Sequence, residues 1–227
     1  MSPPPPIGFA LHGAGRREVP SSPAAFALAE RLGATGLASV VWATADGRAV
    51  LDATGATGGR LRRRPIGGTR AADLPGTVTR LAELLGTTGP GVQVALDVGD
   101  PAVAAEVVAV ARDAGAEDRL WLCHAELDLL ASWRPLSRAV RLVQVTRLRA
   151  MKEGPERRAA DLRTSGIDGV RLPQADWTGG LVALFHRFDL LAAADDARFA
   201  RTVTEAARAG VDAVYSDDPE LLTALAP

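Results

Sequence analysis

The sequence alternates short runs of apolar, β-forming residues with longer stretches in which apolar residues recur at helical spacing. Short apolar runs of this kind are typical of strands covered on both faces, and the stretches between them are typical of the covering helices. The predicted strands are residues 7–12, 37–44, 92–98, 120–123, 140–145, 169–172, 190–193 and 213–215. The predicted helices are residues 23–32, 77–85, 101–114, 125–133, 155–164, 180–187, 196–209 and 219–225. This order predicts an α/β fold in which helices connect parallel strands.

Eight strand–helix units within 227 residues match the length of a compact (β/α)8 TIM barrel. The alternative is a doubly wound open sheet, which usually has about five or six strands. The G-x-G-x-x-G motif of dinucleotide-binding sheets does not follow the first predicted strand. No long linker rich in proline, glycine and serine divides the chain. We therefore predict a single barrel domain over residues 7–227, preceded by a proline-rich leader over residues 1–6.

Composition excludes several functions. The formal net charge is -1 and charged residues make up 23% of the chain, so a basic surface for nucleic acid is not expected. The one cysteine, Cys123, excludes an internal disulfide and a zinc site built from several cysteines, which suits a reducing compartment. No apolar run approaches membrane-spanning length, and the start of the chain does not read as a signal peptide. We predict a cytoplasmic protein without a membrane span, and a homo-oligomer stays open.

The predicted barrel places the candidate site residues at the carboxyl ends of its strands, where barrel enzymes build their active sites. His12, Asp97 and His124 fall at such ends, and two histidines with one carboxylate are a ligand set that transition metals accept. The alternative is that the three are chance neighbours. Arg171 and Trp177 complete the candidate ligand-binding residues. Trp177 follows a strand end and would either line a pocket or anchor the packing.

A basic cluster follows the turn at Asp46 and Gly47. It consists of Arg60, Arg62, Arg63 and Arg64. The cluster could bind an anion, although four charges without interleaved aromatic residues are more typical of a solvated loop.

Several stretches of the chain resemble one known family. They read ALHGAG (10–15), AAFALAERLGATGL (24–37), TADGRAVLDAT (44–54), TRLAELL (79–85) and GVDAVYSDDPELL (210–222). On these stretches the chain resembles the glycerophosphodiester phosphodiesterases, which are (β/α) barrels of the phospholipase-C-like type. The middle of the chain is similar only in length and strand order. The resemblance implies the same barrel fold that the strand–helix pattern predicts.

The resemblance implies a catalytic site that this chain retains only in part. Family members carry an HRG motif on the first strand, in which the histidine is catalytic and the arginine helps to hold phosphate. His12 keeps the histidine here, and Gly13 stands in place of the arginine. A second catalytic histidine precedes an aspartate in the family, whereas residues 51–54 read Leu-Asp-Ala-Thr. By resemblance, His12 is the catalytic residue that remains.

The resemblance also implies a divalent cation such as Ca²⁺ or Mg²⁺, whose ligands are replaced in this chain. Family members place two acidic ligands on the second strand, at the positions of Ala38 and Val40, and a third on the next strand, at Ala95. Asp97 stands where the family has a phosphate-facing lysine. Because hard cations need several oxygen ligands, we expect no metal ion and no other cofactor.

The replaced residues predict a barrel that keeps the family architecture and lacks its reaction. Losing one catalytic donor commonly lowers a rate about 10²–10³-fold, and several roles are missing at once. We expect a catalytically inactive or repurposed relative with a binding or regulatory role, whose partner is a small molecule from the lipid-derived phosphodiester context. Two alternatives stay open. One is a phosphoric diester hydrolase with a relocated site, and the other is a structural barrel whose mouth binds a partner protein.

Overall fold

A computed structural model describes residues 4–58 and 63–225 of the chain as a closed parallel β-barrel. Going around the barrel, the sheet runs from β1 through β12 and β11 to β7 and β2, and pairing of β2 with β1 closes it. The barrel strands are β1 (Ile7–Leu11), β2 (Gly36–Ala43), β7 (Gln93–Val98), β8 (Leu120–His124), β9 (Arg141–Val145), β10 (Gly169–Pro173), β11 (Leu191–Asp195) and β12 (Ala213–Ser216). The predicted (β/α)8 fold is confirmed.

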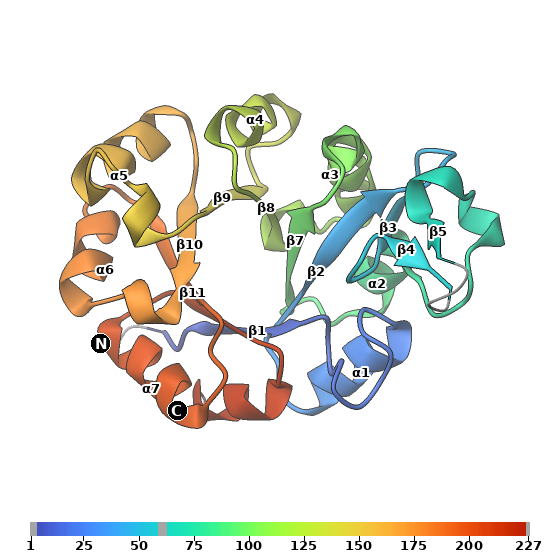
Figure 1. The fold of residues 1–227 in the computed structure, drawn as a ribbon, viewed down its shortest axis with the longest axis horizontal. Coiled ribbons are helices and arrows are strands. Elements are labelled where there is room, and N and C mark those ends of the chain that lie inside the picture. The colour runs from blue at the N-terminus through green and yellow to red at the C-terminus, as the bar shows by residue number, and fades with distance from the viewer. Residues whose placement is uncertain (1–3, 59–62, 226–227) are drawn as a thin grey trace.

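Helices surround the barrel, as Figure 1 shows with the strands meeting at the centre. They are α1 (Pro23–Arg31), α2 (Leu81–Thr87), α3 (Ala104–Asp113), α4 (Leu127–Ser132), α5 (Pro155–Thr164), α6 (Gly179–His186) and α7 (Ala200–Ala209), followed by the 3₁₀ helix η8 (Pro219–Leu225). The start of α1 illustrates why they form where they do. Ser22 caps the helix, since its Oγ accepts a hydrogen bond from the Ala25 amide at 3.1 Å, and Pro23 occupies the first turn.

Among the described residues, no helix is both long enough and apolar enough to span a bilayer.

Helices α2 and α7 each begin four residues later than predicted, α3 and α4 begin three and two residues later, and the last helix is of a different type. Helix α2 begins at Leu81 rather than residue 77, because Thr79 and Arg80 form the short strand β6 (Thr79–Arg80). Helix α7 begins at Ala200 rather than residue 196, because Asp196 has a φ of 61°, which a right-handed helix does not accommodate. Residues 219–225 form a 3₁₀ helix instead of an α-helix.

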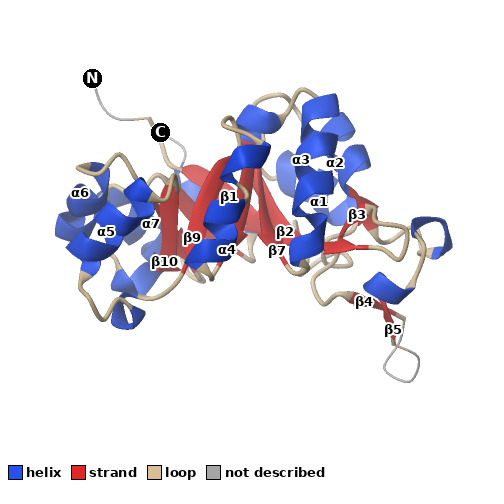
Figure 2. Ribbon diagram, turned by 90° about the horizontal axis from the view of Figure 1, so that it is seen from above, coloured by secondary structure: helices blue, strands red, loops and turns tan. Residues whose placement is uncertain are grey.

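An excursion from the barrel follows β2. The strand β3 (Ala49–Leu51) returns antiparallel to β2, and β6 pairs with β3. Between them lies a small hairpin of β4 (Ala56–Thr57) and β5 (Arg64–Pro65), which projects from the body of the barrel in Figure 2. Arg63 and Arg64 of the predicted basic cluster are exposed on this hairpin, and Arg60 and Arg62 lie outside the described residues.

The alternation of side chains along each barrel strand divides the core into two layers. The interior of the barrel holds Phe9, Ala38, Ala95, Trp121, Cys123, Val143, Ala193, Ala213 and Tyr215. A larger apolar layer lies between the strands and the helices and includes Leu37, Leu96, Leu122, Ala192 and Ala194. Alternate residues of one strand therefore serve different layers. This division decides which strand-end residues can reach the barrel mouth.

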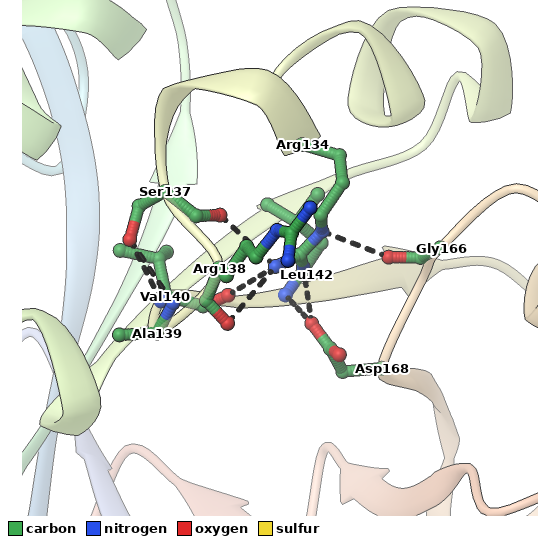
Figure 3. Close-up of polar contacts among 8 residues, drawn as sticks. All are labelled: Arg134, Ser137, Arg138, Ala139, Val140, Leu142, Gly166 and Asp168. Carbon is green, nitrogen blue, oxygen red and sulfur yellow. Dashed lines mark hydrogen bonds and ion pairs between the residues drawn. The ribbon is translucent and has the colours of Figure 1, made fainter.

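At the end of the barrel opposite the mouth, which we call the floor, arginine side chains donate hydrogen bonds to backbone carbonyls. Figure 3 shows Arg134, just after α4, at the centre of such a cluster. Its guanidinium donates to the carbonyls of Ser137, Arg138, Val140 and Gly166 at 3.0–3.4 Å and to the carboxylate of Asp168. Asp168 Oδ2 also accepts the Leu142 amide at 2.7 Å. The cluster joins the start of β9 to the start of β10.

Candidate functional site

The loop that follows β1 carries His12 into an unusual backbone conformation. His12 has a φ of 59° and Ser21, at the other end of the loop, has a φ of 61°. Left-handed residues other than glycine are uncommon and are found preferentially at functional sites. The two residues are joined twice, since His12 Nδ1 lies 3.0 Å from Ser21 Oγ and the Ser21 amide donates to the His12 carbonyl at 3.0 Å. The loop therefore holds the imidazole in a defined place above the barrel.

His12 is half-buried, and its surroundings act on its charge in opposite directions. Burial lowers the pKa of the imidazole below its ordinary value, and the charges of Asp97 and Asp52 raise it by less. The net direction is downward, which favours the neutral ring. A neutral imidazole can donate or accept a hydrogen bond to a ligand, but it does not contribute a cation for binding phosphate.

Gly13 cannot be exchanged for a larger residue without moving the helix behind it. Its φ is +68°, and a Cβ built on it would lie 2.6 Å from the backbone carbon of Ala25 and 2.8 Å from the amide nitrogen of Phe26. Real Cβ atoms essentially never come this close to a backbone. The sequence has no arginine at position 13, and the conformation of this loop also leaves no room for one.

The interior of the barrel mouth is occupied by an ion-pair bridge between Asp97, Arg171 and Asp195. Arg171 Nη2 lies 2.8 Å from both carboxylate oxygens of Asp97, and its Nε lies 3.3 Å from Asp195 Oδ2. The side chain of Arg171 is 6% exposed, whereas the two carboxylates are each 31% exposed. The bridge joins β7, β10 and β11 across the barrel. Two acidic groups on one arginine leave the bridge with a formal negative charge.

Two further polar groups, Cys123 and Tyr215, lie beside the bridge. The Arg171 guanidinium carbon is 4.7 Å from the centre of the Tyr215 ring, which is a cation–π contact. Burial raises the pKa of the Cys123 thiol to about 12, and it raises the pKa of the Tyr215 hydroxyl well above its usual range. Both groups are therefore neutral at ordinary pH. Neither is poised to act as a nucleophile or base.

The positions that the resemblance assigns to metal ligands form an apolar patch beside this bridge. Ala38 lies directly across from Ala95 in the pairing of β2 with β7, and Val40 lies across from Asp97. The side chains of alanine and valine offer no oxygen to a hard cation, so the residues present do not fit the divalent ion of the resembled family. In the two described ranges, no group of three or more His, Cys, Asp or Glu side chains is placed to hold a metal ion.

The remaining two candidates lie in the layer between strands and helices. The ring of His124 packs edge-on against Trp133 at a centroid distance of 5.7 Å, and its Nδ1 accepts the Glu126 amide at 3.0 Å. The structure thus brings Asp97 to Arg171 and does not bring His124 into contact with either. Trp177 packs against Phe185 at 5.7 Å and donates its indole N–H to the Ala193 carbonyl at 3.0 Å. Ligand-binding roles for His124 and Trp177 stay predictions.

Three residues that shape the site were not among the candidates from sequence. Asp195 anchors Arg171, and Ser21 and Ser39 lie behind His12. Ser39 carries the clearest signal, because it is a polar residue inside the apolar run of residues 36–43. Nothing in the local pattern shows that Ser21 and Ser39 meet.

Comparison with solved structures shows which fold this is. A glycerophosphodiester phosphodiesterase from Thermotoga maritima superposes with a TM-score of 0.82 at 16% identity, covering 97% of this chain and 98% of that one. A phosphodiesterase from Oleispira antarctica, in complex with the product sn-glycerol-3-phosphate, gives 0.79 at 17% identity and 98% coverage of both chains. The fold is that of the glycerophosphodiester phosphodiesterases. An Agrobacterium tumefaciens member gives 0.74 at 17% identity, with 96% of this chain and 99% of that one covered.

The predicted resemblance to glycerophosphodiester phosphodiesterases is thereby confirmed at the level of the fold. No protein-family model matches the sequence, and no curated protein matches it. Identities of 16–17% over whole chains show a shared architecture and leave the chemistry to be argued from the residues at the mouth.

Proposed function

We propose that this chain is a non-catalytic barrel with the glycerophosphodiester phosphodiesterase fold, which binds a small molecule at its mouth. The binding or regulatory role would lie in the lipid-derived phosphodiester context, and a cytoplasmic location is part of the proposal. The carrying observation is the backbone of Gly13. The contacts of Gly13 with α1 require a glycine at this position, so the loop in its present form excludes an arginine there.

Two further observations support the loss of the reaction. Hydrolysis of a phosphodiester requires positive charge on the phosphoryl oxygens, commonly from a divalent ion together with Arg or Lys. Ala38, Val40 and Ala95 supply no ligands for such an ion. The buried cation of the mouth, Arg171, is already neutralised by Asp97 and Asp195. A phosphate that approached it would meet two carboxylates of its own sign.

The alternative of an active hydrolase with a relocated site finds less support. It requires His12, Asp97 and His124 to act together, but His124 contacts Trp133 in the outer layer. Of these three residues, His12 is the histidine at the mouth, and its Nε2 has no hydrogen-bond partner among the residues that the structure describes. A single neutral histidine can transfer a proton, but it cannot supply the charge that the reaction needs.

The test combines an activity assay with binding calorimetry. Purified protein would be incubated with glycerophosphocholine in the presence of Ca²⁺ or Mg²⁺, beside the variant His12→Asn, which keeps a residue that tolerates φ near +60°. We expect no release of glycerol-3-phosphate above the blank in either sample. Calorimetric titration with glycerophosphocholine and with glycerol-3-phosphate should give the same heats with and without Ca²⁺.

Two results would contradict the proposal. One is metal-dependent hydrolysis that disappears in His12→Asn, which would make the protein an enzyme. The other is binding of a phosphodiester that becomes tighter by tenfold or more when Ca²⁺ is added, which would show a cation site that the residues do not suggest.

A further inference from the structure

A buried pair of serines is hydrogen-bonded to the Nδ1 side of the His12 ring. Ser21 and Ser39 are each 1% exposed. Ser21 Oγ lies 3.0 Å from His12 Nδ1 and 2.8 Å from Ser39 Oγ. The three side chains therefore form a continuous hydrogen-bonded chain from the strand β2 to the imidazole.

The position of Ser39 favours a role in hydrogen bonding to Ser21 over a role in packing. It stands between Ala38, which faces the barrel interior, and Val40 on a strand that is otherwise apolar. Burying a hydroxyl without a partner costs about 1–3 kcal/mol on mutational scales, so a serine here needs hydrogen bonds. Its strong partner is Ser21, at 2.8 Å, and the Val40 carbonyl, 3.5 Å from its Oγ, is a weak acceptor at the outer limit of a hydrogen bond.

The direction of the hydrogen bonds from His12 to Ser39 follows from which groups can donate and which can only accept. A carbonyl oxygen only accepts, and a serine hydroxyl has a single hydrogen to donate. If Ser39 donates to Val40, then Ser39 accepts from Ser21, and Ser21 in turn accepts from His12. The proton of the neutral imidazole then sits on Nδ1, and Nε2 carries the lone pair.

We propose that Ser21 and Ser39 are positioning residues that fix the orientation and tautomer of His12, so that Nε2 faces the mouth as a hydrogen-bond acceptor. None of the described residues hydrogen-bonds Nε2. The charged groups that act on the ring are Asp97 and Asp52, and their carboxylates are also acceptors. A ligand group that meets this side of the mouth must therefore donate a hydrogen bond, as a hydroxyl does. The inference rests on the proposed function only in taking the mouth as the binding site.

The backbone around the pair supports a positioning role. Ser21 is held in its left-handed conformation by two contacts besides the serine chain. Its amide donates to the His12 carbonyl, and its carbonyl accepts the hydroxyl of the buried Thr79 at 2.7 Å. The hydroxyl of Ser21 is thus delivered to His12 from a fixed backbone. Preorganisation of this kind is what holds a functional side chain in one geometry.

Nitrogen-15 NMR of the histidine rings tests the proposal on the protein without ligand. The chain has three histidines, so the His12 signals can be assigned by comparison with His124→Gln and His186→Gln. At neutral pH we expect His12 to show two well-separated ring-nitrogen signals, with Nδ1 protonated and Nε2 not. In Ser39→Ala, the Ser21 hydroxyl becomes free to donate or accept. Both tautomers then form, and the two signals move toward their average.

Two companion variants separate positioning from a general loss of structure. Ser21→Gly removes the hydroxyl and suits the φ of +61°, so it should reproduce the Ser39→Ala spectrum in a well-folded protein. Thr88→Val is the matched control, because Thr88 is a buried hydroxyl at the floor that accepts a hydrogen bond from Arg119 at 2.9 Å. It should leave the His12 signals unchanged.

The proposal is overturned if the wild-type ring carries its proton on Nε2 or is already tautomer-averaged. It is also overturned if Ser39→Ala and Ser21→Gly leave both nitrogen signals in place. These spectra do not involve phosphodiester hydrolysis, so a negative result here is distinguishable from a failure of the proposed function.

Discussion

The floor and the mouth of this barrel each contain an arginine at the centre of a polar cluster, but the partners differ. Arg134 at the floor is held mainly by backbone carbonyls, which belong to the fold itself. Arg171 at the mouth is held by two side-chain carboxylates, those of Asp97 and Asp195. Arg119, also near the floor, follows the first pattern, since it donates to the carbonyls of Leu85, Gly89 and Val92.

The difference in partners gives the floor arginines a structural role and leaves the mouth arginine in a place where substitutions can change the charges. Backbone acceptors cannot be replaced by substitution, so an arginine that satisfies them is needed as long as the loops keep their course. Side-chain acceptors can be changed together with the arginine. The mouth of a barrel can therefore exchange its charges while the floor preserves the fold, in agreement with the separation of activity and stability between the two faces of such barrels.

The largest effect should come from Arg134→Met. The substitution leaves four carbonyls and the carboxylate of Asp168 without their donor, and we expect a loss of about 3–5 kcal/mol in the free energy of unfolding. Neutralising Asp168 as well, in Arg134→Met with Asp168→Asn, should recover little, because most of the acceptors are backbone. Urea unfolding measures both. Substantial recovery in the double variant would remove the contrast between the two clusters.

The next effect is that of Arg171→Met, for which we expect a loss of about 2–4 kcal/mol. It leaves Asp97 and Asp195 without a cation, although water can reach both carboxylates. The triple variant with Asp97→Asn and Asp195→Asn should recover more than half of the loss, because no buried charge then remains. Urea unfolding of the single and triple variants checks this. A triple variant no more stable than the single one would show that the mouth arginine is as fixed as that of the floor.

A smaller loss is expected for Gly13→Ala in the mouth loop. The new Cβ would meet the backbone of α1 at 2.6 Å, and overpacking with a left-handed backbone together costs about 2–3 kcal/mol. Gly47→Ala is the matched control, since Gly47 has a φ of +73° and no atom of the described residues lies within 4 Å of a Cβ built on it. It should cost only about 1 kcal/mol, the conformational part. Equal thermal shifts for the two variants would mean that α1 moves freely, and that an arginine could enter at position 13.

The smallest effect is a pH dependence contributed by His12. Because the folded-state pKa lies below that of the unfolded chain, about 6.5, the unfolded chain binds the proton first as pH falls. Stability should therefore decline as the pH drops from about 6.5 through the folded pKa, and His12→Asn should remove this contribution. Melting temperatures between about pH 7.5 and about pH 5 measure the difference. A variant whose melting temperature falls as steeply as that of the wild type would show that His12 does not contribute.

The fold could be predicted because its signals are local. The period of apolar residues marks each strand and helix, and Ser22 with Pro23 marks the start of α1. The clearest error occurs where a distant contact overrides the local pattern. Thr79 joins the sheet through β3 and donates to Ser21, so the helix expected from residue 77 begins only at Leu81. Sequence periodicity does not report such a contact.

The site could be predicted only in part, because its chemistry depends on which side of a strand each residue faces. Asp97 and Arg171 both lie near strand ends and face the barrel interior, and there they form an ion pair. His124 is also at a strand end, but it is next to Cys123, which faces inward, and so its ring faces the outer layer. A shift of one residue along a strand changes the face, and the end of a strand is the least certain part of a sequence prediction.

By itself, the sequence determined the (β/α)8 architecture and the absence of acidic side chains at positions 38, 40 and 95, since both can be read from residue types and their spacing. The tertiary structure decided what took their place. It brought Arg171 between two carboxylates, closed the space beside Gly13 with α1, and placed Ser39 behind His12. The physical reason is that hydrogen bonds and ion pairs act over a few ångströms in space, and closure of the barrel brings together residues as far apart in the chain as Asp97 and Asp195.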